Sequence, residues 1–359
     1  MKQGWESRKL GDICDIKTGK SNAKDADADG KYTFFDRSKK AKKSNRFLFD
    51  CEALIIPGEG AQFFPRYYSG KFDLHQRVYS ISNFPEEVDI HFVQYYLIFN
   101  HKHFERVAVG TTVKSLRLRH FTEIEIPIPP LEEQKQIVAK LDQCFEAIDK
   151  AKANAVKNLE NAKELFQSKL NDIFSQKGEG WVEKKLGDVC SLIGGGTPSK
   201  KNKQFYTGDI LWATVRDMKL DVITQTECSI TKEAVSKSST NIIPKGNVII
   251  ATRVGLGKVC LINQDTAINQ DLRGVIPKEK SDLQVKYLFW WFKSISKLII
   301  NEGTGATVQG VKLPFVKSLN IPIPTTASQS NIVALLDTLQ EQTQSLESKY
   351  QQELNSLEE

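Results

Sequence analysis

In two stretches of the chain, the apolar residues recur with the periodicity of a long α-helix. From Leu131 onward, apolar or small side chains recur at steps near three and four as far as Ile173, with one interruption at Lys152. A second series with the same rhythm runs from Ile332 to Leu357. A helix of about 40 residues is roughly 60 Å long, which exceeds the needs of a globular domain. We therefore expect the two apolar stripes to pack against each other. A helix that lies across its own domain is the alternative.

Shorter apolar runs predict globular structure before each long helix. Residues 53–57 (ALIIP) and 247–251 (NVIIA) are short, largely apolar stretches bounded by Gly and Pro, which is typical of short buried strands. Residues 89–99 and 282–292 are rich in aromatic residues, and we expect two buried helices with Asp89 and Asp282 as N-caps. Their aromatic stripes favour packing in a core over stacking on nucleic-acid bases.

The predicted elements recur in the same order in both halves of the chain. Residues 126–129 (IPIP) return as residues 321–324, about 195 positions later. The start of each half is matched at an offset of 176, pairing Trp5, Leu10 and Cys14 with Trp181, Leu186 and Cys190. We predict an α+β protein made of two mixed globular units, residues 1–130 and 177–324, with helical segments at 131–176 and 325–359. A duplicated chain is suited to a two-fold partner such as duplex nucleic acid.

Charge separates the globular units from the helices. The chain has 50 basic and 44 acidic residues. The two helical segments together hold 8 of the basic and 14 of the acidic residues, so the remainder carries a net charge of +12. A basic globular surface indicates a polyanion partner. The six cysteines form no C-x-x-C pair, and no apolar run approaches the roughly 20 residues of a membrane span. We expect a soluble cytoplasmic protein with no membrane contact.

The sequence offers little support for catalysis. It has no Walker A lysine loop and no Asn-Pro-Pro-Tyr motif of the kind that holds a flipped adenine. All five histidines lie in the first half, and none recurs at a matched position in the second. His101 and His103 have no nearby carboxylate or cysteine cluster, so a metal site is not expected. A self-contained enzyme is therefore disfavoured.

Candidate DNA-binding residues lie near the start of each half. A run at residues 37–46 holds six cations and no acid, which suits phosphate neutralisation, although a solvated surface loop is an equal alternative. The candidates in the first half are Lys20, Asn22, Arg37, Lys39, Lys40, Lys42, Lys43 and Arg46. Those in the second half are Thr197, Ser199, Lys200 and Lys201, in a stretch that we match to the basic run.

Candidate base-reading residues follow each apolar strand. Bidentate pairing with bases needs side chains such as Arg, Asn or Gln. The candidates are His75, Gln76 and Arg77 in the first half and Arg253, Asn269 and Gln270 in the second. The same side chains also commonly satisfy backbone groups, and that alternative stays open. Two Gly-Thr turns would offer hydroxyl and backbone N–H groups to phosphates, unless these turns are only structural. Their candidates are Thr111, Thr112, Lys114, Thr304, Thr307 and Gln309.

The order of these motifs resembles one known family. W-x4-L-G-D-x-C opens each half, G-K-S-N or G-G-T-P-S follows, G-T-T or G-T-G-A-T comes late, and I-P-I-P precedes a helix with Q-x-x-I-V-x-x-L-D. This arrangement is similar to the specificity subunits of Type I restriction-modification enzymes over essentially the whole chain. The resemblance implies two target-recognition domains with pseudo-two-fold symmetry, each reading half of a bipartite DNA site from the major groove. It also implies that the two long helices form an antiparallel coiled coil that sets the gap between the half-sites.

The resemblance also implies partners for a chain that has no catalytic activity or cofactor of its own. Two modification subunits would carry S-adenosylmethionine and methylate one adenine in each half-site. Restriction subunits would translocate and cleave DNA using ATP and Mg. The alternative is a stand-alone architectural DNA-binding protein without catalytic partners.

Overall fold

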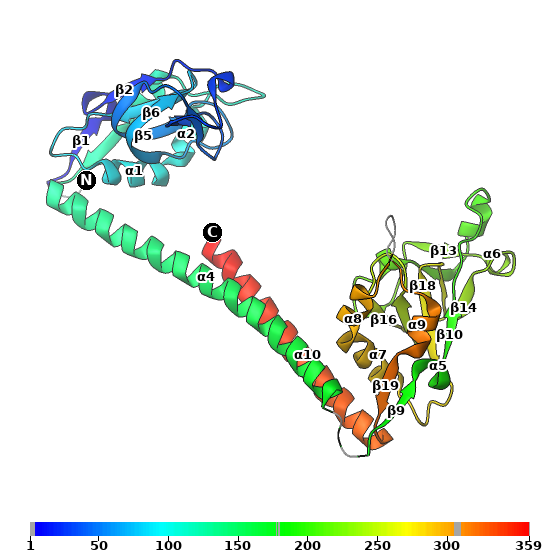
Figure 1. Cartoon of the computed structure of the whole chain (residues 1–359). Helices are drawn as coiled ribbons and strands as arrows, with labels where there is room; N and C mark the ends of the chain where they lie inside the picture. Colours follow the sequence, from blue (N-terminus) through cyan, green and yellow to red (C-terminus); the bar gives the residue numbers. More distant parts are fainter. Residues whose placement is uncertain (1–3, 177, 179, 305–309, 359) are drawn as a thin grey trace. The chain divides into compact units, whose positions relative to one another are not determined.

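The computed structural model of the chain describes residues 4–176, 178, 180–304 and 310–358. The chain separates into two compact units, residues 1–150 (unit 1) and 151–359 (unit 2). Each unit is built on β-sheet covered by short helices (Figure 1). In unit 1, α1 (Ile90–Phe99) lies against β5 (Phe49–Pro57) and β6 (Arg66–Leu74). In unit 2, α7 (Val285–Ser294) lies against β15 (Val248–Ala251) and β16 (Val259–Ile262). None of the helices in the described part of the chain is both long and apolar enough to cross a membrane.

A small antiparallel strand pair closes each unit at the base of its long helix. In unit 1, β1 (Glu6–Lys9) pairs with β8 (Glu125–Ile128), and in unit 2, β9 (Val182–Lys185) pairs with β19 (Asn320–Ile323). Glu6 faces Ile128 and Val182 faces Ile323, so the two I-P-I-P strands have the same register. The predicted tandem repeat is therefore confirmed at the level of individual backbone pairs.

The main sheets share a core order and differ at the edge. Unit 1 has one six-stranded sheet in the order β2-β7-β5-β6-β3-β4. Its strands are β2 (Asp15–Thr18), β3 (Tyr32–Phe35), β4 (Lys42–Ser44), β5 (Phe49–Pro57), β6 (Arg66–Leu74) and β7 (Val78–Ser82). Unit 2 has two sheets, ordered β10-β18-β15-β16-β12 and β13-β11-β17-β14.

The strands of unit 2 are β10 (Cys190–Gly194), β11 (Ile210–Ala213), β12 (Val222–Ile223), β13 (Cys228–Ile230), β14 (Asn241–Ile243), β15 (Val248–Ala251), β16 (Val259–Ile262), β17 (Thr266–Ile268) and β18 (Leu272–Pro277). The single long strand β6 of unit 1 corresponds to the two strands β16 and β17 of unit 2, because β3 pairs parallel with the end of β6 as β11 does with β17. This break divides the sheet of unit 2. The buried strands expected at residues 53–57 and 247–251 are confirmed in β5 and β15.

Short helices connect or follow the strands of both units. Those of unit 1 are η1 (Leu10–Asp12), η2 (Ala23–Asp25), α1 (Ile90–Phe99), α2 (His101–Val107) and α3 (Leu118–Thr122). Those of unit 2 are α5 (Leu186–Val189), η3 (Lys203–Tyr206), η4 (Val215–Asp217), α6 (Lys232–Ser236), α7 (Val285–Ser294), α8 (Ser296–Asn301) and α9 (Leu313–Ser318). The aromatic side chains of α7 are buried, which confirms core packing for this helix.

One of the two predicted N-caps is confirmed and the other is wrong. The Asp89 carboxylate accepts hydrogen bonds from the backbone N–H groups of His91 and Phe92 and so caps α1. Helix α7 begins later than expected, and its N-cap is Gln284 rather than Asp282. The backbone of Asp282 has another role, because its carbonyl accepts a hydrogen bond from Gln329.

A buried glutamine at the start of each long helix clamps three chain segments together. In unit 1, Gln134 accepts a bond from the Asp89 N–H (2.8 Å) and donates to the carbonyls of Glu87 (2.8 Å) and Pro129 (2.8 Å). Gln329 makes the same three bonds in unit 2, with Gln284 N–H (2.9 Å) and the carbonyls of Asp282 (2.8 Å) and Pro324 (3.1 Å). Both glutamines are fully buried. Each side chain therefore ties the first turn of a long helix to the backbone of its own unit.

The two long helices are α4 (Leu131–Ser175) and α10 (Thr326–Glu358). In unit 2 the second half of α4 and α10 run antiparallel (Figure 1), and Leu170 and Phe174 share a core cluster with Val333 and Leu336. The predicted pairing of two helical stripes is confirmed. The last turns of α4 also pack on α7, because the ring of Phe174 lies 5.3 Å from that of Tyr287.

Candidate nucleic-acid interface

Several candidate residues follow the ends of two parallel strands in each unit. In unit 1, β3 and β6 end together, and the His75 N–H donates to the Phe35 carbonyl (2.9 Å). In unit 2, β11 and β17 end together, and the Asn269 N–H donates to the Ala213 carbonyl (3.0 Å). The residues after these strands therefore meet at one edge of each sheet, here called the recognition edge.

His75 and Asn269 hold the backbone of the recognition edge. They are 8% and 6% exposed, and each accepts the N–H two residues later: His75 Nδ1 from Arg77 (3.1 Å) and Asn269 Oδ1 from Asp271 (3.1 Å). Burial, reinforced by the charge of Arg37, lowers the pKa of His75 below 6.5 and favours the neutral ring that can accept this bond. These contacts use the acceptor atoms of both residues within the protein, so the backbone-satisfying alternative applies to them.

Gln76 and Gln270 are the exposed residues at the centre of the recognition edge. Gln76 Nε2 donates to Asn22 Oδ1 (3.0 Å), and Gln270 accepts a bond from the Thr197 hydroxyl. Asn22 and Thr197 lie in the turns after β2 and β10, so each glutamine is tethered to the matched turn of its own unit. That both glutamines read bases stays a prediction.

The glycines of these turns allow two backbone segments to approach each other. A Cβ at Gly19 would lie 1.9 Å from the Leu74 carbonyl oxygen, and one at Gly195 would lie 2.2 Å from that of Ile268. Real side chains cannot occupy such positions. The turn therefore needs glycine for close packing of the backbone, as expected for a structural turn.

Glu59 connects three candidate segments of unit 1 and was not among the predicted residues. Its carboxylate accepts bonds from Arg37 Nη1 (2.9 Å), Arg77 Nη1 (2.5 Å) and Ser115 Oγ (3.2 Å). The basic run, the segment after β6 and the Gly-Thr turn therefore meet at one acid. Arg253 occupies the matched position in unit 2 and was predicted, so the repeat itself contained the signal for Glu59.

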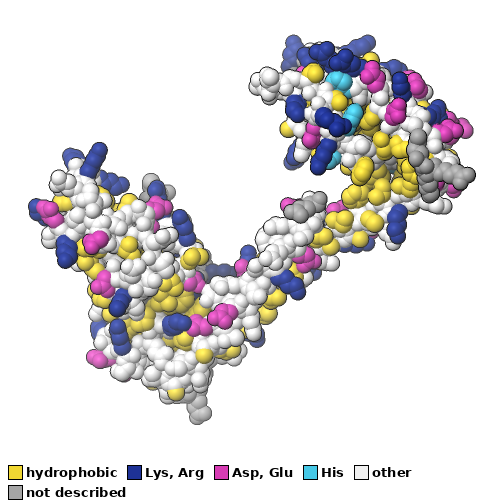
Figure 2. Space-filling model, turned by 180° about the vertical axis from the view of Figure 1, so that it is seen from behind, with side chains coloured by type: hydrophobic (Ala, Val, Ile, Leu, Met, Phe, Trp, Pro, Cys, Tyr) yellow, Lys and Arg dark blue, Asp and Glu magenta, His cyan; other side chains and the backbone are white. Residues whose placement is uncertain are grey.

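The basic run of unit 1, residues 37–46, covers the turn after β3 and continues through β4. Three of its cations pair with acids: Arg37 with Glu59, Lys42 with Asp36 (2.6 Å) and Arg46 with Asp73 (3.2 Å). Lys39, Lys40 and Lys43 are exposed and have no ion pair with any described residue. Figure 2 shows Lys and Arg side chains gathered on the upper edge of unit 1. These three lysines are therefore free to neutralise phosphates.

The basic stretch of unit 2 is not the counterpart of this run, which corrects the match made from the sequence. Ser199, Lys200 and Lys201 lie between β10 and β11, one loop earlier than the basic run. The turn that corresponds to the run is residues 214–227, because β13 pairs with β11 as β4 pairs with β3. An insertion in this turn shifted the sequence match. It carries Arg216 and Lys219 together with three acids, Asp217, Asp221 and Glu227.

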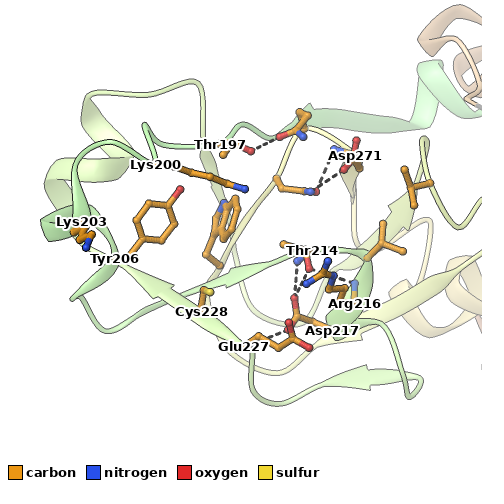
Figure 3. A pocket seen from close by; sticks show the side chains of 15 residues that line it. Thr197, Lys200, Lys203, Tyr206, Thr214, Arg216, Asp217, Glu227, Cys228 and Asp271 are labelled. Atoms are coloured by element: carbon orange, nitrogen blue, oxygen red, sulfur yellow. Dashed lines mark hydrogen bonds between the residues drawn. The ribbon is translucent and has the colours of Figure 1, made fainter. Parts of the chain in front are cut away.

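The recognition edge of unit 2 borders an open hollow with a volume of about 790 Å³. Figure 3 shows Lys200, Tyr206, Arg216 and Glu227 around it. Asp217 also lines the hollow, and its carboxylate accepts bonds from the Thr214 N–H (2.7 Å) and the Glu227 N–H (2.7 Å). This network fixes the inserted turn beside Gln270.

The Gly-Thr turns have matched backbone pairing. Val109 bridges Ser115 in unit 1, and Thr304 bridges Gly310 in unit 2. Thr111 and Thr112 are exposed, as is Lys114, whose ammonium donates to the Glu105 carbonyl (2.8 Å). Thr307 and Gln309 lie outside the described residues. Lys20 is exposed at the turn after β2.

Comparison with known proteins agrees with this geometry. The family model described as "Type I restriction modification DNA specificity domain" matches residues 2–158 and 178–356. The chain is 32% identical over 240 residues to the Type I restriction enzyme EcoR124I/EcoR124II specificity subunit of Escherichia coli, which covers 64% of this chain and 59% of that protein. It is 31% identical over 159 residues to the MjaIX specificity subunit of Methanocaldococcus jannaschii, covering 44% of this chain and 37% of that protein. These matches span less than two thirds of the length of either relative.

Solved structures share the fold over nearly the whole chain. The HsdS subunit from Thermoanaerobacter tengcongensis has a TM-score of 0.62 at 19% identity and covers 99% of this chain and 94% of its own. A chain from a type I R-M system, solved to explain complex assembly and conformational transition, has a TM-score of 0.70 at 21% identity and covers 99% of this chain and 95% of its own. At these identities the likeness establishes the architecture.

Proposed function

The chain belongs to the family of Type I restriction modification DNA specificity domains, and on that premise we propose that it selects the DNA sequence on which a restriction-modification complex acts. Each unit reads one half of a bipartite site at its recognition edge. The paired helices α4 and α10 hold the two halves at a fixed separation. A rigid spacer of this kind makes the second half-site contact intramolecular, which raises its effective concentration.

The observation that carries this proposal is the duplicated recognition edge. Gln76 and Gln270 occupy matched, exposed positions, and each is tethered to the turn after the first sheet strand of its unit. Glutamine and arginine at such an edge have the donors and acceptors that bidentate base contacts require. The three free lysines of the basic run, Lys39, Lys40 and Lys43, would add sequence-independent phosphate contacts.

The chemistry belongs to partner subunits under this proposal. Methyltransferase subunits carrying S-adenosylmethionine and restriction subunits using ATP and Mg dock on the helical segments. Two matched helical repeats offer two similar docking surfaces, which favours two modification subunits per chain. The support for this step is family membership together with the repeat of Gln134 and Gln329, which orient the two helices alike.

The test is methylation sequencing of a host that expresses this chain with the modification subunit encoded beside it, compared with the same host lacking this chain. We expect methyl-adenine in a two-part motif with a fixed gap only when the chain is present. Methylation that does not depend on the chain contradicts the proposal. A chain that binds DNA specifically but forms no complex would instead support a stand-alone architectural protein, which no observation in the structure favours.

A further inference from the structure

An ion pair of opposite polarity occupies the same place in the two units. In unit 1, Arg77 Nη1 lies 2.5 Å from Glu59 Oε1, and in unit 2, Arg253 Nη1 lies 3.8 Å from Asp271 Oδ1. Glu59 matches Arg253, and Arg77 matches Asp271, at the offset of 194 that also relates Gln76 to Gln270. The acid and the base have therefore exchanged segments between the units: the acid follows β5 in unit 1 and precedes β18 in unit 2.

The backbone around this pair is the same in both units. The Gly58 N–H donates to the Arg77 carbonyl (2.8 Å), and the matched Thr252 N–H donates to the Asp271 carbonyl (2.8 Å). Glu59 bridges Ser115 as Arg253 bridges Gly310. Since the same backbone bonds form with either polarity, the fold does not require the acid in one particular segment. The polarity decides which of the two segments carries the arginine, and therefore where the guanidinium group meets solvent.

The acids are shielded and the arginines are accessible. The side chains of Glu59 and Asp271 are 14% and 17% exposed, whereas those of Arg77 and Arg253 are 57% and 51% exposed. Arg37, on the same carboxylate as Arg77, is 51% exposed. An exposed ion pair contributes little to stability. An arginine held by an acid nevertheless loses less conformational freedom on binding, which is the condition for a selective contact.

We propose that Glu59 and Asp271 are positioning residues that orient base-reading arginines, and that the exchanged polarity makes the two units read different half-sites. This inference rests on the proposed function. Unit 1 presents two guanidinium groups, Arg37 and Arg77, on one carboxylate, and each has five N–H donors. Val215 stands at the position matched to Arg37, so unit 2 presents one arginine from this set. Because arginine pairs bidentately with guanine, unit 1 reads a half-site that contains guanine.

The acid also explains why these arginines do not act as simple phosphate contacts. A carboxylate repels phosphates, and it occupies guanidinium donors that would otherwise bind the DNA backbone of any sequence. Glu59 therefore weakens sequence-independent binding while it preserves discrimination at one base pair. A residue with only a structural role has neither effect.

The experiment selects bound duplexes from a random-sequence DNA pool with the full chain and with two variants, Glu59→Gln and Arg253→Gln. We expect Glu59→Gln to lower discrimination about tenfold at guanine positions of one half-site and to leave the other unchanged. Its affinity for a scrambled duplex should rise, and the salt slope should steepen by about one unit, because freed arginine donors gain a phosphate contact. Arg253→Gln should relax the opposite half-site.

Arg77→Lys provides a second variant that keeps the positive charge and removes the planar fork. It should lose the guanine preference while the salt slope stays at its wild-type value. Two results overturn the inference and leave the proposed function standing, because the wild-type chain still selects a two-part motif. In one, Glu59→Gln relaxes both half-sites equally. In the other, the half-site that it alters contains no guanine. A wild-type chain that selects no two-part motif overturns the proposed function and the inference together. Thermal unfolding of each variant confirms that the fold is retained.

Discussion

The turn after the central strand carries an acid in unit 1, Glu59, and a base in unit 2, Arg253, although the backbone bonds around the two turns match. The next turn at the recognition edge differs as well. In unit 1 it is short and basic, with Lys39 and Lys40, whereas residues 214–227 of unit 2 are longer and carry three acids. The two units thus share a backbone and differ in the charges that it presents.

This difference separates two kinds of residue in a duplicated protein. Gln134 and Gln329 make the same three bonds, and the I-P-I-P strands keep the same register. The matched helices and strands that these features hold together are here called the frame. The charged turns vary while the frame stays constant. Under the proposed function, such an arrangement lets one scaffold present two specificities. The comparison can be tested first on the frame, then on the charged turns, and finally on a single histidine.

The largest effect is expected from the glutamines of the frame. Gln134→Ala leaves two carbonyls and one N–H without their partner in a fully buried site, and Gln329→Ala does the same in unit 2. Each change should lower the free energy of unfolding by about 3 kcal/mol, because unsatisfied buried groups cost roughly 1 to 3 kcal/mol each and are partly relieved by water. Urea unfolding of the full chain measures both.

The control variants are Gln143→Ala and Gln344→Ala, which replace exposed glutamines on the same two helices. These should change the free energy of unfolding by less than about 0.5 kcal/mol. Four of the five tryptophans lie in unit 2, so their fluorescence reports mainly on that unit while circular dichroism reports on both. If Gln134→Ala or Gln329→Ala leaves the free energy of unfolding unchanged, the two units are not equivalent even where their hydrogen bonds match.

The frame was largely predictable from the sequence because its signals are local. A continuous apolar run marks β5, and Asp89 is an N-cap that bonds within its own turn. The second N-cap was misplaced because Asp282 lies close to the start of α7 and has the expected chemistry, but its carbonyl bonds to Gln329 from a distant helix. Tertiary contacts of this kind leave no local pattern.

The recognition edge was predicted less completely, for a different reason. Gln76, Arg77 and Arg253 were identified from their chemistry and their place after a strand. Glu59 was missed because a lone acid between two glycines is typical of a turn, and its three donors come from separate segments. The parallel pairing that brings these segments together is not encoded in any one of them. The inserted turn of unit 2 also displaced the match to the basic run.

An intermediate effect is expected from the basic run of unit 1. Replacing Lys39, Lys40 and Lys43 with Gln removes three exposed charges that have no acidic partner among the described residues. Affinity for every DNA sequence should fall, and the salt slope should flatten by about 2.7, because each phosphate contact contributes about 0.9. Fluorescence titration of a mixed-sequence duplex over a range of salt measures both quantities.

The matched control removes the same charge from the long helix through Lys157→Gln, Lys163→Gln and Lys169→Gln. These lysines are exposed on α4, outside both recognition edges. The control should leave the salt slope of the isolated chain unchanged. An equal flattening by both triple variants would mean that the slope follows net charge alone, and the contrast between the basic run and the rest of the chain would then have no role in binding.

The smallest effect concerns the histidines, which occur only in unit 1. Burial lowers the pKa values of His75, His103 and His120 below 6.5. As pH falls through 6.5, the unfolded chain binds protons before unit 1 does, so the free energy of unfolding declines below about pH 6.5 and is unaffected above about pH 7.

Unit 2 has Asn269 where unit 1 has His75, and both accept the same backbone bond (3.1 Å). His75→Asn should therefore preserve the recognition edge and reduce the loss of stability between about pH 7 and pH 5, as followed by urea unfolding. An unchanged pH profile in this variant would assign the loss to His103 and His120, because unit 2 contributes no histidine to it.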